Sequence, residues 1–214
     1  MTGGQIVDSQ VLNGTAHLGG GAVVQGTGRL VRCLVSGNNG GDSGGGVAIS
    51  GEGVVENSLI KSNTAIWGAD VQVNSSTAWL INCTVVVKSG SDRPTVFLET
   101  NGGNVFNSVM FGLVRTKKGE LAYCACDREP QLYDQTSTTS LHDNIIVDAS
   151  IFEDTTNYCP KKRSVLRGKG APQEYAAHAV SPVDYAGNRR LYRNHIDIGH
   201  FQFPPPGGMV IMVK

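Results

Sequence analysis

The sequence predicts an all-β fold, a single-stranded parallel β-helix whose coils each take about 25 residues. The first observation is a repeat: a small residue recurs at positions 33, 58, 83 and 108, in three steps of 25, and Asp8-Ser9 fits 24 residues earlier. The second is composition, since the repeats are poor in helix formers and alternate short apolar runs with Gly, Asn and Ser. This pattern is typical of short strands joined by turns. The dense leucine lattice of a leucine-rich repeat is missing.

Equivalent side chains in such a fold stack one coil apart, at the strand spacing of roughly 4.8 Å, and so form columns. We expect two apolar columns and one column of small residues to point inward: Leu30, Val55, Leu80 and Val105; Val35, Ile60, Val85 and Met110; Cys33, Ser58, Cys83 and Ser108. Beside them Asn57, Asn82 and Asn107 recur, with Arg32 in the same place one coil earlier. Because Asn tolerates a left-handed backbone and its amides can bond to one another, this column predicts a ladder along one corner.

Length and composition indicate one domain with a buried core, since 40% of the 214 residues are hydrophobic. Eighteen basic residues balance eighteen acidic ones, which argues against nucleic acid or an anionic membrane as the main partner. No apolar run approaches the ~20 residues of a membrane span, and no signal peptide is visible at Met1. The chain opens in mid-coil at residues 5–7 without an amphipathic cap. We therefore expect a C-terminal fragment, or a homo-oligomer in which another subunit covers the open N-terminal end.

Within the single domain 1–214, residues 3–115 are expected to form nearly five regular coils. The next position that fits the small column is Ser150, 42 residues after Ser108. Residues 116–147 are therefore expected to be an inserted loop region, the kind of segment that often carries binding on a rigid scaffold. We expect 148–205 to form the last coil and a C-terminal cap. A Pro-Pro-Pro-Gly-Gly break predicts a short strand or tail over 206–214.

The five cysteines do not form an evident disulfide framework. Cys33 and Cys83 share a column two coils apart, a separation of roughly 9–10 Å that is too long for a disulfide, so we expect buried thiols. Cys124, Cys126 and Cys159 lie outside the repeat. Structural or free thiols are the favoured interpretation for them. A disulfide, or a metal site completed by His142, is the alternative.

Two stretches carry a resemblance to known proteins. The repeats resemble the right-handed parallel β-helix repeats of bacterial secreted and surface proteins, on the segments 44–47, 54–60 and 62–65. The C-terminal stretch resembles the closing segment of choice-of-anchor Q type surface proteins, on Ser181-Pro182, 184–190 and 196–199. That segment usually ends in an aromatic-acidic-aromatic run, whereas this chain has His200-Phe201-Gln202-Phe203.

The resemblance covers nearly the whole chain except about 115–147. It implies right-handed coils and export to the cell surface. Most members of that group have no established activity. The better-known β-helix relatives are polysaccharide lyases and glycoside hydrolases.

Several motifs are interpreted as structural. Ser43 lies in a Gly-Asp-Ser-Gly-Gly motif like that of chymotrypsin-like proteases, but only 42 residues precede it and the motif falls in a Gly-rich turn. A Ca²⁺ ion held by Asp42 and nearby carbonyls is an alternative for this turn, and no other cofactor is expected. The basic cluster 161–163 is interpreted as a solvated loop. The group His195, Asp197 and His200 is expected to be a hydrogen-bonded end cap, with metal ligation as the alternative.

The outward columns contain a candidate glycan site. Glu56 is the only acidic residue in them, Trp79 lies one coil further along and Arg29 one coil earlier. Enzymes that cleave glycans need several carboxylates, or carboxylates with a basic residue, on one face. A ring beside a carboxylate and a guanidinium instead suggests a platform on which a sugar stacks. The alternative is that Trp79 is covered by the inserted segment or the tail.

The favoured function is a secreted or cell-surface module that binds polysaccharide or a surface protein without catalysis. Its ligand-binding candidates are Trp79, Glu56 and Arg29, with His142 and Asp143 from the inserted region. The first alternative is a carbohydrate-active enzyme, a polysaccharide lyase or glycoside hydrolase, in which His142, Asp143 and Asp148 would act. The second alternative is a structural protein that assembles through its N-terminal end.

Overall fold

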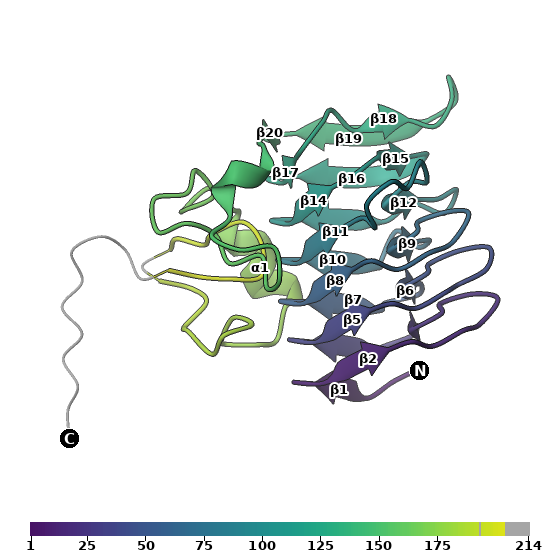
Figure 1. The fold of residues 1–214 in the computed structure, drawn as a ribbon, viewed down its shortest axis with the longest axis horizontal. Coiled ribbons are helices and arrows are strands. Elements are labelled where there is room, and N and C mark those ends of the chain that lie inside the picture. The colour runs from purple at the N-terminus through teal and green to yellow at the C-terminus, as the bar shows by residue number, and fades with distance from the viewer. Residues whose placement is uncertain (193, 204–214) are drawn as a thin grey trace.

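The protein is a parallel β-solenoid of three sheets, so the predicted fold class is confirmed (Figure 1). The computed structural model describes residues 1–192 and 194–203. Sheet A contains, in order, β1 (Gln5–Val7), β4 (Arg29–Val31), β7 (Val54–Glu56), β10 (Trp79–Ile81), β13 (Asn104–Phe106), β16 (Lys118–Ala122) and β19 (Thr138–His142).

The other two sheets complete the triangular coil. Sheet B contains β2 (Gln10–Leu12), β5 (Leu34–Ser36), β8 (Leu59–Lys61), β11 (Thr84–Val86), β14 (Val109–Phe111), β17 (Ala125–Cys126) and β20 (Ile145–Ile146). Sheet C contains β3 (Ala22–Val24), β6 (Val47–Ile49), β9 (Val71–Val73), β12 (Val96–Leu98), β15 (Val114–Thr116) and β18 (Gln131–Leu132). Each strand pairs in parallel with its equivalents in the neighbouring coils, which is why consecutive strands of the chain lie in different sheets.

The core lies inside the coils and follows the predicted columns. Leu30, Val55, Leu80 and Val105 are paired in register and fully buried, and so are Val35, Ile60, Val85 and Met110. The small column forms a hydrogen-bonded stack: the backbone N–H of Cys33 donates to Ser58 Oγ, and that of Cys83 donates to Ser108 Oγ. Cys33 and Cys83 are free buried thiols, as predicted.

The predicted corner is also present. Arg32, Asn57, Asn82 and Asn107 all have left-handed backbones, with φ between 50° and 52°. The expected amide ladder is only partly formed, because one amide-to-amide bond, from Asn107 Nδ2 to Asn82 Oδ1, joins the described residues of this column. The Nδ2 groups of Asn57, Asn82 and Asn107 also donate to a segment that packs outside the coils, whereas Asn57 Oδ1 has no hydrogen-bond partner in the described part of the chain.

The inserted loop predicted for residues 116–147 is absent. This region instead contains two further coils, which are shorter than the others. The paired positions of sheet A are separated by 24 residues in the first step, by 25 from Arg29 to Asn104, and then by 16 and 20 residues at Glu120 and Ser140. Asn144 continues the small column, since its Oδ1 accepts the N–H of Cys124. The shorter coils have shortened turns, and a search for a fixed step of 25 therefore passes over them.

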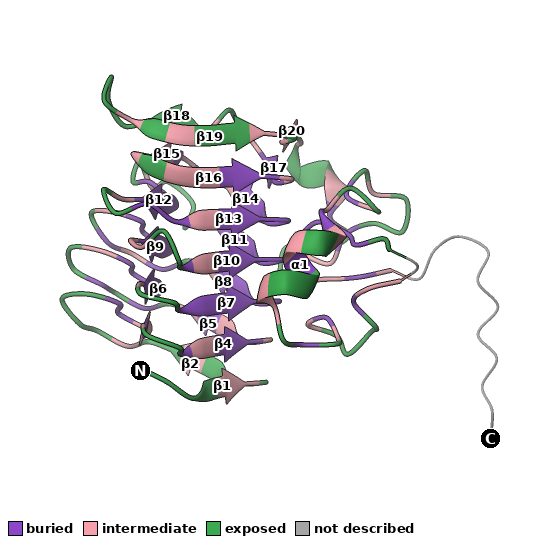
Figure 2. Cartoon of the chain, turned by 180° about the vertical axis from the view of Figure 1, so that it is seen from behind, coloured by how far each residue is buried: buried purple, intermediate pink, exposed green. Residues whose placement is uncertain are grey.

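Residues 148–203, called the side segment below, do not form the predicted last coil and cap. They contain the short 3-10 helix Ala149–Ile151 and the helix α1 (Pro172–His178), and pack against the side of the coil stack (Figures 1 and 2). Ser150, expected in the small column, lies in that 3-10 helix and is exposed. The expected strand or tail over 206–214 falls outside the described residues. Within the part of the chain that the structure describes, no helix has the length and apolar character to cross a membrane.

Candidate functional site

The outer face of sheet A carries every residue that the sequence predicted to bind ligand, except for Asp143, which directly follows β19. Strand pairing aligns Arg29, Val54 and Trp79 in one outward row, which continues through Asn104 to Glu120. The neighbouring row contains Glu56 and ends at His142. The outward columns predicted for β4 to β13 are therefore present, and they extend onto the two short coils.

Helix α1 packs at the carboxyl ends of the middle strands of sheet A, at one edge of this face (Figure 2). Its Tyr175 packs with Ile196 of the side segment onto Val54, Ile81 and Phe106 in one buried apolar cluster. The helix is short and has no side-chain N-cap, so its position depends on this packing more than on its own propensity. The Trp79 group lies beside the C-terminal end of α1, and His142 lies three strands further along sheet A.

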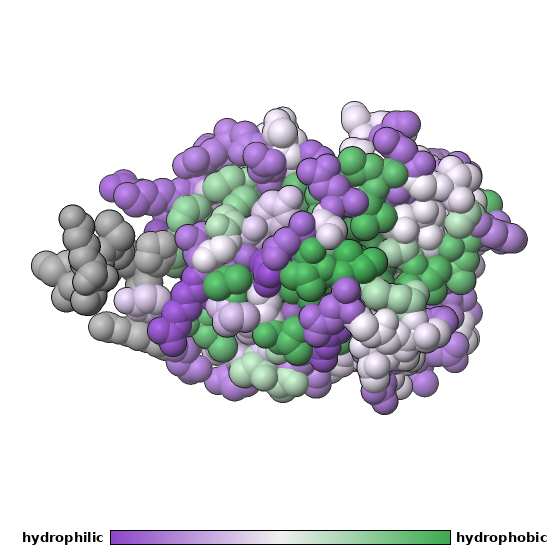
Figure 3. Space-filling model, turned by 90° about the horizontal axis from the view of Figure 1, so that it is seen from below, coloured by the Kyte–Doolittle hydropathy of each residue, from purple (hydrophilic) through white to green (hydrophobic). Residues whose placement is uncertain are grey.

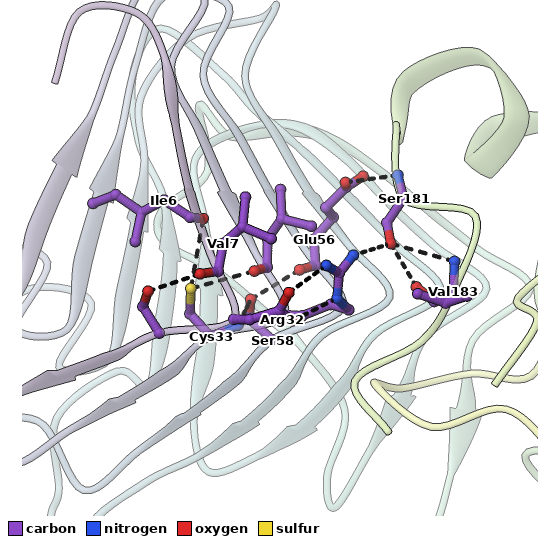
Figure 4. A network of polar contacts seen from close by, with 11 residues as sticks. Ile6, Val7, Arg32, Cys33, Glu56, Ser58, Ser181 and Val183 are labelled. Atoms are coloured by element: carbon purple, nitrogen blue, oxygen red, sulfur yellow. Dashed lines mark hydrogen bonds and ion pairs between the residues drawn. The ribbon is translucent and has the colours of Figure 1, made fainter. Parts of the chain in front are cut away.

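Glu56 lies beneath the side segment and serves to hold it. Its carboxylate is fully buried and accepts the backbone N–H groups of Val180 and Ser181, at 2.9 Å and 3.0 Å (Figure 4). Desolvation raises the pKa of this carboxyl group. With both oxygens engaged and no exposed surface, Glu56 has no free acceptor for a ligand while the segment is in place.

Arg32 contributes to the same attachment, which explains its departure from the asparagine column. Its guanidinium donates to both carboxylate oxygens of Asp8, at 2.7 Å and 2.6 Å, and to Ser181 Oγ at 2.5 Å (Figure 4). An arginine can bridge two acceptors at this spacing, whereas the shorter asparagine amide cannot. The first coil is thereby joined to the side segment.

Beside the C-terminal end of α1, Trp79 lines an open pocket of about 380 Å³. The imidazole of His178 stacks on the indole, with ring centroids 3.5 Å apart and planes 15° from parallel. Arg29 Nη1 donates to the His178 carbonyl at 2.9 Å, which fixes the guanidinium at the pocket wall. Glu52 and Thr77 supply further polar groups. Trp79 is thus covered in part by the C-terminal portion of the chain and remains half-buried.

His178 is suited to a neutral role in this pocket. Partial burial lowers the pKa of its imidazole. The neutral ring offers one N–H donor and one acceptor nitrogen. Together with Arg29 and Glu52, the pocket therefore presents donors and acceptors around an aromatic surface, which is the usual composition of a small-molecule site.

At the end of β19, His142 lies between two carboxylates, one from Glu120 in β16 and one from Asp143, the next residue of the chain. Its Nε2 lies 2.8 Å from Glu120 Oε1, and its Nδ1 lies 2.8 Å from Asp143 Oδ2. These two bonds raise the pKa of His142, because both carboxylates favour the imidazolium. The Tyr123 ring meets His142 edge-on at 5.7 Å. The predicted pair His142 and Asp143 is thus brought together, but it is separated from Trp79 by two intervening strands of sheet A, β13 and β16.

The other sequence candidates have structural positions. Asp148 caps the short 3-10 helix by accepting the N–H of Ser150. Asp197 bonds the N–H groups of Gly168 and Phe203, and buried His200 contacts Thr84, so both hold the side segment in place. Asp42 lies at the surface, 3.3 Å from His17.

The other three cysteines are also free thiols. Cys124 and Cys126 are buried free thiols and Cys159 is a partly buried one. Among the described residues no three His, Cys, Asp or Glu side chains are grouped as metal ligands would be.

Sequence reasoning missed Glu120, Tyr123 and His178. Glu120 would have been found by extending the outward row from Asn104 across a 16-residue coil instead of a 25-residue one. No signal in the repeat indicates His178, because its position depends on how the side segment folds back over sheet A.

Comparisons with known proteins identify no relative for this chain. No family model matches it, and neither a curated protein nor a solved structure shows significant similarity to it.

Proposed function

We propose that the protein is a glycan-binding β-solenoid module that acts without catalysis. The observation that carries the proposal is the pocket at Trp79, where an aromatic ring, a fixed guanidinium and a carboxylate line one open space. Sugars combine apolar ring faces with a rim of hydroxyl groups, so a ring flanked by charged hydrogen-bonding groups matches their chemistry. Glu52 is the carboxylate that lines this pocket. Because no second carboxylate among the described residues lines the pocket, Glu52 supports binding better than acid–base catalysis by a pair of carboxylates.

The test is a binding assay against a panel of plant, host and bacterial polysaccharides, with products followed by mass spectrometry. Binding without products, weakened in Trp79→Phe and Arg29→Gln, is the expected result. Glu52→Gln removes the charge at the rim and should weaken binding less. Binding that is unchanged in both Trp79→Phe and Arg29→Gln would contradict the site, and release of oligosaccharides would contradict the non-catalytic role.

A carbohydrate-active enzyme is the second candidate, and the group formed by Glu120, His142 and Asp143 favours it. An imidazole held between two partly exposed carboxylates is able to exchange protons at a pH near neutrality. Cleavage of any polysaccharide that is lost in His142→Asn and Glu120→Gln, but kept in Trp79→Phe, would favour this candidate over the binding module.

An assembly role is supported by the ends of the coil stack. In the last coil Leu132, Leu141 and Ile146 occupy inward positions, yet they are 51%, 38% and 50% exposed. At the other end, β1 and β2 each pair on one side only, and apolar surface is mixed with polar groups (Figure 3). Open strand edges favour pairing with another chain. A mass that rises with concentration in sedimentation experiments would support a homo-oligomer.

The proposal places the protein at the outside of a bacterial cell. This part rests on the resemblance of its repeats, and of Ser181-Pro182 with the stretch that follows, to bacterial surface β-helix proteins. Cell fractionation with antibodies against the protein tests it. Recovery only in the cytoplasmic fraction would contradict it.

A further inference from the structure

The outer face of sheet C carries an aromatic cluster that the glycan site on sheet A does not use. Trp67 precedes β9, Phe97 lies in β12 and Tyr133 follows β18, so the cluster joins distant parts of the stack. The ring centroids of Trp67 and Phe97 are 5.5 Å apart, and each lies 5.7 Å from that of Tyr133. Phe97 is buried at the base, whereas Trp67 and Tyr133 keep exposed surface.

Polar groups surround these rings and complete a pocket of about 190 Å³. Lys117 Nζ stands 5.4 Å above the centre of the Tyr133 ring, and the Glu99 carboxylate accepts from Gln72 Nε2 at 2.5 Å. Ser43 and Thr100 contribute hydroxyl groups to the lining. The carboxylate is therefore held in one orientation, and the ammonium is held over the aromatic surface.

The one cation and the one carboxylate that line the pocket differ in how they are engaged. Lys117 contacts the Tyr133 ring. Outside the lining, Arg115 pairs with Phe97 from the next strand, and Asp134 lies within electrostatic range of Lys117. Glu99 is the one acidic residue of the lining, and it is already engaged by Gln72. An anionic ligand is favoured here, because it can pair with the Lys117 ammonium. A cationic ligand would have to pair with the Glu99 carboxylate, which already accepts a hydrogen bond from Gln72.

We infer that this pocket binds an acidic sugar residue of a glycan, with its ring against Trp67 and its carboxylate at Lys117. The exposed rings match the apolar face of a pyranose, and Glu99 with the two hydroxyl groups matches its hydroxyl rim. The polar side chains that line the pocket beside the rings disfavour a long apolar ligand. The site is independent of the pocket at Trp79, which lies on a different sheet of the coil.

The chain contains two tryptophans, one in each pocket, so each site can report separately. In Trp79→Phe the only indole is Trp67, and in Trp67→Phe the only indole is Trp79. The probe is tetragalacturonate, with cellotetraose as the neutral match, and binding is measured by calorimetry alongside tryptophan emission. We expect saturable binding of tetragalacturonate to Trp79→Phe with a change in emission, and weaker binding of cellotetraose.

Charge is tested with a matched pair of neighbouring lysines. Lys117→Gln removes the ammonium from the pocket and should weaken tetragalacturonate binding roughly tenfold, the effect of losing about 1.4 kcal/mol of one charge-assisted contact. Lys118→Gln, an exposed neighbour in β16, should leave the affinity unchanged. Trp67→Ala should abolish the binding, and its folding is checked by thermal unfolding beside Trp67→Phe.

Three results would overturn the inference. One is the absence of calorimetric binding to Trp79→Phe, and another is equal affinity in Lys117→Gln and Lys118→Gln. The third is binding that is kept in Trp67→Ala and lost in Trp79→Phe, which would assign the acidic glycan to sheet A and would support the proposed function while removing this site. Failure of the sheet A proposal is seen separately: in Trp67→Phe, the emission of Trp79 would not change when either oligosaccharide is added.

Discussion

Two corners of the same coil use asparagine in opposite ways. At the corner between sheets A and B, Asn57, Asn82 and Asn107 turn outward and bind the side segment through Tyr175 Oη, the Asp197 carbonyl and the Ala171 carbonyl. At the corner between sheets B and C, Asn38 Nδ2 donates to Asn63 Oδ1, and Asn63 Nδ2 donates to Asp70 Oδ1, each at 2.9 Å. The column at the A–B corner, called the outer column, attaches the side segment to the coils. The column at the B–C corner, called the inner column, is a hydrogen-bonded ladder inside the coils.

The difference shows that spacing alone does not determine what a polar column does. Both columns repeat every 25 residues, and both are buried. The backbone separates them: the outer asparagines have positive φ, while Asn38 and Asn63 are absent from the left-handed residues. The Nδ2 groups of the outer asparagines donate to neutral carbonyl and hydroxyl partners, whereas the inner ladder ends on an ionisable group. The two corners should therefore respond differently to mutation and to pH.

The largest expected effect is at the outer corner. Tyr175 is buried, donates to the Ser181 carbonyl and accepts from Asn57. Tyr175→Ala should destabilise the protein by about 3–5 kcal/mol through loss of a buried ring. Tyr175→Phe keeps the ring and should cost about 1–2 kcal/mol through its lost hydrogen bonds. Denaturant unfolding measures both, and limited proteolysis should cut the side segment first in Tyr175→Ala. Equal stability of the two variants would show that packing of α1 on sheet A is not what holds the segment.

The sequence determines much of this architecture and little of the second layer. The columns at Leu30, Val55 and Leu80 could be predicted because the strand spacing repeats identical environments every coil. The short coils at Glu120 and Ser140 could not, because the lengths of turns and strands change there while the strands still pair in parallel with the preceding coil. The candidate site was found in part, since Arg29 and Trp79 follow from the outward row, whereas the burial of Glu56 depends on a side segment with no repeat.

The next effect concerns the inner ladder and depends on pH. Burial raises the pKa of Asp70 from 3.8 to about 8, and its Oδ2 has no hydrogen-bond partner. The folded protein therefore retains this proton up to about pH 8, while the unfolded chain releases it near pH 4. Between these values the unfolded state binds fewer protons, so stability falls as pH rises, by on the order of 3 kcal/mol or more.

Asp70→Asn removes this titration and keeps an acceptor for Asn63. The variant should match the wild type near pH 4 and exceed its stability at pH 8 by about 2–4 kcal/mol, measured by denaturant unfolding at each pH. Asp42→Asn, at an exposed turn, serves as the control and should change neither value. A stability difference between Asp70→Asn and the wild type that stays constant from pH 4 to pH 8 would show that the ladder stabilises the ionised carboxylate.

At the outer corner the pH trend should run in the opposite direction. Burial lowers the pKa of His200 to about 3, with Arg190 and Lys61 nearby also disfavouring a further positive charge and Asp154 favouring it. Its Nε2 faces the Asn157 carbonyl and so carries the proton, which leaves Nδ1 to accept from Thr84 Oγ1. Below pH 6.5 the unfolded chain gains a proton that the folded state does not, so stability is lost as pH falls toward 3.

The size of this loss is about 2 kcal/mol between pH 7 and pH 5. His200→Gln should be less stable than the wild type at pH 7, and should lack this part of the acid response. His17→Gln, at an exposed position, keeps the response and is the matched control. An identical slope in His200→Gln and the wild type would assign the acid sensitivity to other groups.

The smallest effect distinguishes the corners most directly. At one corner a glycine variant should be more stable than the alanine variant, and at the other corner it should be less stable. At Asn82, with φ of 51°, alanine is strained while glycine is not, so Asn82→Gly should be more stable than Asn82→Ala by about 1 kcal/mol. At Asn38 the backbone is ordinary, and Asn38→Gly should be less stable than Asn38→Ala by about 0.5–1 kcal/mol because glycine gains more freedom on unfolding. Each pair removes the same amide, so the lost hydrogen bonds cancel within the pair and only the backbone term remains. The same order at both positions would mean that the two columns do not differ in backbone conformation, and that another cause directs one outward and the other inward.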